Sequence, residues 1–170
     1  MKFKMKIFLG FLLLFICIYL FSIRRIGVFD FTDEQITDYH ILYDFKGTEF
    51  KDSILEDKQV ADKLVDRIRE EDYRGVFEFN PGDTVISYVT NGDITLMVRT
   101  AKGDDYYSYM FDIDGSGRIR YKKYKSYKLE GYTNLVDKRI RIGFRGNQKI
   151  RDLYNDLKVI IEETTETSSK

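Results

Sequence analysis

Residues Asp93–Lys128 read DITLMVRTAKGDDYYSYMFDIDGSGRIRYKKYKSYK, and this stretch contains three strand-like runs separated by two turns. The runs at 93–100, 106–113 and 118–128 are rich in aromatic and aliphatic residues, as β-strands are. The sequences between them favour tight turns: Lys102-Gly103-Asp104-Asp105 and Asp114-Gly115-Ser116-Gly117. Because short connections join strands that lie antiparallel and adjacent, this stretch predicts a three-stranded meander.

Further strand patterns lie on both sides of the meander. Within 36–45, Tyr39, Ile41 and Tyr43 alternate with polar residues, the period-2 pattern of a strand with one buried face. Additional strands are predicted at 76–79, 84–90 and 136–144. Two turn sequences support these boundaries, Asn80-Pro81-Gly82-Asp83 and the hairpin dipeptide Asn91-Gly92.

Two segments have helical periodicity. Asp57 is a suitable N-cap for a helix that ends near Asp72 and buries Val60, Ala61, Leu64, Val65 and Ile68. Asn147 caps a second helix, with Ile150, Leu153, Leu157 and Ile160 on one face. The sequence therefore predicts an α+β domain over 26–163, with an antiparallel meander sheet of about five to seven strands and two helices packed on it. Residues 164–170 are predicted to be a disordered polar tail.

The N-terminal segment suggests a membrane anchor. Residues Ile7–Ile23 are free of charge, and basic residues flank them at Lys2, Lys4, Lys6 and Arg24-Arg25. As a helix they would extend roughly 25 Å, near the lower limit for crossing a bilayer. The segment lacks the small residues of a cleavage site, so 1–25 is predicted to be an uncleaved signal anchor, a single transmembrane helix. The balance of basic residues favours a cell-membrane protein with its domain outside the cytoplasm; the reversed orientation stays open.

The composition excludes several classes of site. The chain has one Cys and one His, too few for a disulfide or an ordinary zinc site, so no metal and no cofactor are predicted.

Residues Asp112–Ile119 resemble the first eight positions of an EF-hand calcium loop, with Asp112, Asp114 and Ser116 at ligand positions. However, Lys123 takes the place of the bidentate glutamate, which favours a hairpin turn and leaves a weak calcium site as the alternative. Sparse Ala and Pro together with abundant Lys, Ile, Tyr and Phe suggest an AT-rich genome, either bacterial or phage-borne.

Catalytic patterns are sparse. His40 has Asp38 and Asp44 as sequence neighbours, but no serine lies in a nucleophile-elbow sequence, and the chain has no phosphate-binding glycine loop. We therefore expect no enzyme and no catalytic residue. A carboxylate-dependent hydrolase is kept as a minor alternative, since acidic residues are numerous.

Charge is segregated along the chain. Residues 26–117 contain 9 basic and 21 acidic groups, whereas 118–151 contain 12 basic and 2 acidic groups. The basic region yields eight candidate anion-binding residues: Arg118, Arg120, Lys122, Lys128, Lys138, Arg139, Arg141 and Arg145. Two other interpretations stay open: the halves neutralise each other across the sheet, or 118–128 is an edge strand whose lysines prevent aggregation.

These observations predict a binding or interaction role outside the cytoplasm. The partner would be a protein, or alternatively an anionic envelope polymer or lipid headgroup held by 118–151. No nucleic acid is expected, and no small-molecule substrate can be identified.

Overall fold

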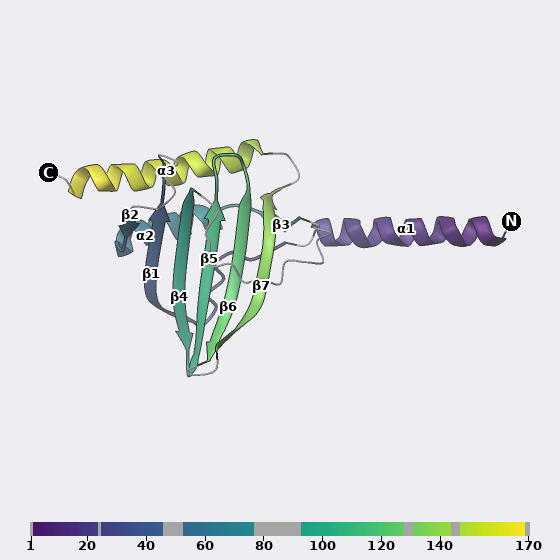
Figure 1. Ribbon diagram of the computed structural model, residues 1–170, viewed down its shortest axis with the longest axis horizontal. Helices are drawn as coiled ribbons and strands as arrows, with labels where there is room; N and C mark the ends of the chain where they lie inside the picture. The colour runs from purple at the N-terminus through teal and green to yellow at the C-terminus, as the bar shows by residue number, and fades with distance from the viewer. Residues whose placement is uncertain are drawn as a thin grey trace.

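The computed structural model describes residues 2–23, 25–45, 53–76, 93–127, 131–143 and 147–168. Its centre is a seven-stranded sheet in the order β2-β1-β4-β5-β6-β7-β3, in which every neighbouring pair is antiparallel (Figure 1). The strands are β1 (Gln35–Tyr43), β2 (Ser53–Leu55), β3 (Tyr73–Gly75), β4 (Ile94–Lys102), β5 (Asp105–Ile113), β6 (Ile119–Tyr127) and β7 (Gly131–Ile142). The predicted α+β class is confirmed.

The meander forms where its turn sequences predict it. In the β4–β5 hairpin Lys102 pairs with Asp105, and in the β5–β6 hairpin Ile113 pairs with Ile119. Gly103 and Gly117 adopt φ angles of 62° and 89°, which a residue with a Cβ adopts only at a cost. The edges of the sheet are β2 and β3. Since β6 pairs with β5 on one side and β7 on the other, the interpretation of 118–128 as an edge strand is wrong.

The sheet has two chemically different faces. Ile41, Leu96, Phe111 and Tyr121 form a row across four strands, and all four are buried; we call their side of the sheet the core face. The alternate row consists of His40, Met97, Met110, Lys122 and Asp137, and we call its side the outer face. Successive residues of a strand point to opposite faces of the sheet. These two rows therefore show on which face each of the other strand residues lies.

Two helices cover the core face: α2 (Lys58–Arg69) and α3 (Gln148–Ser168). Asp57 caps α2 as predicted, and the five predicted apolar residues of that helix are all buried. Helix α3 buries Ile150, Leu153, Leu157 and Ile161, and continues to Ser168 instead of ending before the polar stretch 164–170. In Figure 1 both helices lie on one side of the sheet.

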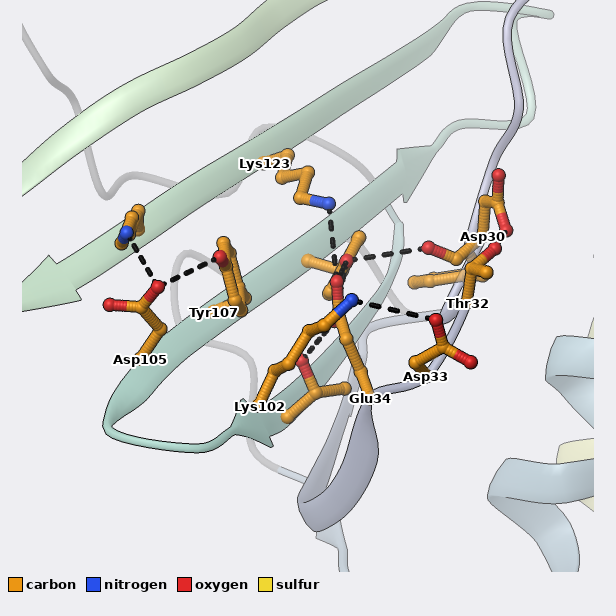
Figure 2. Close-up of polar contacts among 12 residues, drawn as sticks. Asp30, Thr32, Asp33, Glu34, Lys102, Asp105, Tyr107 and Lys123 are labelled. Atoms are coloured by element: carbon orange, nitrogen blue, oxygen red, sulfur yellow. Dashed lines mark hydrogen bonds and ion pairs between the residues drawn. The ribbon is translucent and has the colours of Figure 1, made fainter.

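The chain between α1 and β1 is fastened to the core face. Phe29 is fully buried and contacts the rings of Phe111 and Tyr121, and Arg69 donates hydrogen bonds to the carbonyl oxygen of Phe29. Figure 2 shows the neighbouring polar cluster around Glu34, toward which Lys123 points. The carboxylate of Glu34 accepts hydrogen bonds from Tyr109 Oη at 2.6 Å and from Thr100. This segment therefore closes the core next to the β4–β5 hairpin.

Helix α1 (Lys2–Ile23) projects away from the sheet as a single helix (Figure 1). Its apolar side chains from Ile7 to Leu20 are largely exposed. Across the described segments, however, no helix has the length and apolar character needed to cross a membrane. This finding corrects the predicted single-pass signal anchor, and the cell-membrane location with an extracytoplasmic domain is not supported. The uncharged part of α1 extends only roughly 25 Å, short of a hydrocarbon core about 30 Å thick.

Several predicted features fall partly or wholly outside the described residues. They are the strand at 84–90, all but Val76 of the strand at 76–79, and the turns at 80–83 and 91–92. The strand predicted at 136–144 is β7, which begins five residues earlier, at Gly131.

Candidate functional site

Six arginines gather on the outer face where β6, β7 and β3 lie side by side. Arg120 pairs directly opposite Arg139, Arg74 opposite Arg141, and Arg25 opposite Arg74 in an isolated bridge. Arg118 immediately precedes β6, two residues before Arg120. We call Arg25, Arg74, Arg118, Arg120, Arg139 and Arg141 the arginine patch.

Three aspartates pair with four of these guanidinium groups. Asp137 accepts two parallel hydrogen bonds from Arg120, at 2.7 and 2.9 Å. Asp72 accepts one from Arg74 at 2.8 Å, and Asp114 accepts one from Arg118 Nε at 2.8 Å. Asp72 also lies 3.2 Å from Arg25 Nε. The six arginines and three aspartates together carry a net charge of +3.

The patch is accessible at its margins and fixed at its centre. The side chains of Arg25 and Arg118 are 79% and 69% exposed, whereas that of Arg74 is only 11% exposed. Neighbouring strands are about 4.8 Å apart and alternate residues about 6.7 Å apart. From β6 through β7 and β3 to Arg25 there are three such spacings, so the patch spans roughly 14 Å across the strands, room for more than one anionic group.

Such an arrangement suits oxyanions. Like charges directly opposite each other on a sheet destabilise the pair, so two Arg–Arg pairs in neighbouring ladders carry a cost in the free protein. A guanidinium offers a planar fork of N–H donors that matches a phosphate or carboxylate group. An anion bound over the patch would thus reduce the repulsion between the arginines and would also accept hydrogen bonds from them.

The eight predicted anion-binding residues do not all lie in one place in the structure. Arg118, Arg120, Arg139 and Arg141 belong to the patch. Lys122 lies on the same face but is only 2% exposed, so it is not accessible to a polymer. Lys138 alternates to the opposite face, where it lines a hollow of about 320 Å³ with Leu135 and Val136, and Arg25 at the margin of the patch also borders this hollow. Lys128 and Arg145 lie outside the described residues.

Two members of the patch were not predicted from the sequence. Arg74 belongs to the acidic half of the chain and to a strand of three residues, too short for a periodic pattern. Arg25 closes the apolar N-terminal segment, which suggested an anchor. The pairing of the edge strand β3 with β7 was the information needed to place both residues, and no local sequence pattern contains it.

The EF-hand-like stretch forms the β5–β6 hairpin turn. Asp114 Oδ1 accepts hydrogen bonds from Ser116 Oγ at 2.5 Å and from the backbone N–H of Arg118 at 3.0 Å. Asp112 is buried beside Thr95, whose hydroxyl donates to Asp112 Oδ1 at 2.7 Å. Both carboxylates therefore serve the fold, as the hairpin interpretation predicts, and the turn positions Arg118 at the margin of the patch.

Interactions in the turn change the acidity of Asp114. Burial raises the pKa of this carboxyl, but hydrogen bonds from Ser116 and Arg118 together with the charge of Arg118 outweigh burial and hold the pKa below its ordinary value. Asp114 is therefore ionised at neutral pH, where its carboxylate accepts a hydrogen bond from the guanidinium of Arg118.

The remaining titratable candidates have structural partners. His40 Nε2 lies 2.9 Å from Asp38, also on β1, and His40 Nδ1 lies 3.4 Å from Glu56, which follows β2. Burial and the hydrogen bond to Glu34 raise the pKa of Tyr109. That pair belongs to the cluster that fastens the N-terminal segment, as described above.

Comparison of the chain with protein-family models, with curated proteins and with solved structures gives no match.

Proposed function

We propose that this protein is a binding module that holds an acidic polymer, a chain of repeating phosphate or carboxylate groups, on its arginine patch. The supporting observation is the register that sets Arg120 against Arg139 and Arg74 against both Arg141 and Arg25. A sheet that served only stability would gain by alternating charge at these positions.

The existing ion pairs support this proposal. Asp137, Asp72 and Asp114 fix the orientations of Arg120, Arg74 and Arg118, so little side-chain entropy is lost when the ligand binds. The net charge of +3 attracts the polymer, and release of its counterions adds to the affinity. Because this contribution depends on ionic strength, binding should weaken as salt rises.

The first experiment measures binding of the full chain to fluorescently labelled polyphosphate and, in a parallel series, to polyglutamate, each at several salt concentrations. The test variant is Arg25→Gln/Arg139→Gln, since both residues are exposed, Arg25 at the margin of the patch and Arg139 on β7 within it. Loss of two charge-assisted hydrogen bonds should lower the affinity about tenfold or more. Higher affinity for one polymer identifies which oxyanion the patch prefers.

A matched control is available on the helices. Lys63→Gln/Lys149→Gln removes the same total charge from exposed residues of α2 and α3 and should change the affinity less than about threefold. Arg25→Lys/Arg139→Lys retains the charge but removes the planar fork, so its affinity should lie between those of the wild type and the glutamine variant. Equal losses in the two glutamine variants, or no binding to either polymer, would contradict the proposal.

A further inference from the structure

A pocket of about 350 Å³ lies on the outer face at the end of the sheet away from the arginine patch. We call it the tyrosine pocket, and the side chains that shape it are those of Met97, Met110, Tyr106, Tyr124, Tyr132, Ser108, Ser126 and Arg99. Tyr124 follows Arg120 by four residues on β6, so the two sites are about 13 Å apart along the strand. The pocket and the patch share no residue.

The strand register explains why a hollow forms. Tyr106 of β5 pairs opposite Ser126 of β6, and Ser108 pairs opposite Tyr124. Small and large side chains therefore alternate on the same face, and the two serines leave space between the rings. Tyr132 of β7 extends the wall, because its ring meets that of Tyr124 edge to face at a centroid distance of 5.8 Å.

The walls are apolar and suited to a flat ligand. Met97 and Met110 pair with each other across β4 and β5 and form the floor, with Met110 only 3% exposed. Thioether groups adapt to the outline of a ring and make favourable contacts with it. Tyrosine rings offer faces for stacking and edges for T-shaped contacts. The volume falls within the roughly 300–1,000 Å³ typical of small-molecule sites.

One cation stands at the rim. Arg99 pairs opposite Ser108, and its side chain is 51% exposed. Its Nη1 donates to Asp38 on the β1 side at 3.2 Å. A guanidinium has five N–H donors, and Arg99 borders the pocket, so donors beyond the one that contacts Asp38 can serve a ligand there.

We propose that the tyrosine pocket binds a small aromatic carboxylate. The ring lies between the tyrosines over the two methionines, and the carboxylate accepts hydrogen bonds from Arg99 and from the hydroxyl of Ser108. Asp38 repels an anion that approaches from β1, which restricts the carboxylate to the side of Arg99 that faces Ser108.

The absence of tryptophan from the chain allows a direct test. Indole-3-acetate is fluorescent at wavelengths where the 13 tyrosines do not absorb, so titration of the full chain reports the probe alone. The uncharged amide of the same probe measures what the ring contributes without the carboxylate. A charge-assisted hydrogen bond is worth about 1.5–3 kcal/mol, so the carboxylate should bind about tenfold or more tightly than the amide.

The variant Arg99→Gln should bind the carboxylate probe only as tightly as it binds the amide probe. Its affinity for the amide probe should equal that of the wild type. Lys102→Gln is the matched control, because Lys102 lies on the same strand, is 53% exposed and pairs with one aspartate, Asp33, at 3.6 Å; it should keep the preference. Ser108→Phe fills the hollow and should abolish binding of both probes, with unchanged circular dichroism as the check on folding.

The proposal is overturned by three results. The first is no binding of the carboxylate probe at millimolar concentration. The second is equal affinity for the carboxylate and the amide. The third is an undiminished preference for the carboxylate in Arg99→Gln. The polymer-binding proposal is unaffected by any of them, since its residues lie at the other end of the face.

Discussion

At the level of single residues, Asp114 shows how one carboxylate organises both the turn and the margin of the candidate site. It accepts hydrogen bonds from Ser116, from the backbone of Arg118 and from the guanidinium of Arg118. Its side chain is only 12% exposed, and these bonds lower its pKa despite burial. A carboxyl with a lowered native pKa stabilises the fold above its unfolded pKa, and this contribution is lost as pH falls through the native value.

Replacement of Asp114 by Asn should therefore destabilise the protein by about 1–2 kcal/mol at neutral pH, the scale of a charge-assisted hydrogen bond. The ordinary pKa is 3.8, so the difference from the wild type should shrink as pH falls below about 4. Urea unfolding at a series of pH values from 7 to 3 measures this difference. A constant difference over that range would show that Asp114 acts through packing and not through its charge.

At the level of secondary structure, α2 illustrates an element whose limits follow from local chemistry. Asp57 has extended backbone angles and accepts hydrogen bonds from the backbone N–H groups of Gln59 at 2.7 Å and Val60 at 3.2 Å. These donors have no partner within the helix itself. The apolar residues then recur every three or four positions and face the sheet.

Loss of this cap should have a measurable cost. Asp57→Ala removes the acceptor and should lower the free energy of unfolding by about 1 kcal/mol, whereas Asp57→Asn keeps a good cap and should stay within a few tenths of the wild type. Thermal or denaturant unfolding of the two variants provides the comparison. Equal destabilisation by Ala and Asn would mean that the charge of Asp57, and not its capping oxygen, is what matters.

At the level of the whole molecule, one face of the sheet packs against the core and the outer face carries both candidate sites. The core face is sealed by α2, α3 and the segment around Phe29. Helix α1 stands apart from this core and exposes apolar side chains along its length. Its main contact with the remaining elements is at β3, close to its C-terminal end.

Removal of residues 1–23 should therefore leave the domain folded, with a free energy of unfolding within about 1 kcal/mol of that of the full chain. The shortened protein should also aggregate less, since a large exposed apolar surface promotes association. Circular dichroism with thermal unfolding tests the first expectation, and light scattering tests the second. A large drop in melting temperature would show that α1 supports the core.

The candidate site could be predicted only in part. Alternation along two basic segments was sufficient to group Arg118 with Arg120, and Arg139 with Arg141, because residues two apart share a face. The same rule excludes Lys138, which the charge-based prediction had included. The depth of Lys122 could not be predicted from alternation, since its burial depends on the neighbouring strands and their side chains.

Local physical chemistry in the sequence determined the β4–β5–β6 meander, the capped helix α2 and the amphipathic face of α3. Turn residues and apolar periodicity act over a few positions, so they can be recognised without the rest of the chain. Only the tertiary structure decided that β6 is an interior strand, that Arg25 and Arg74 join Arg141, and that the tyrosines of β5, β6 and β7 surround a hollow. Each of these depends on pairing between residues distant in sequence, whose register is set by the packing of the complete core and not by any local pattern.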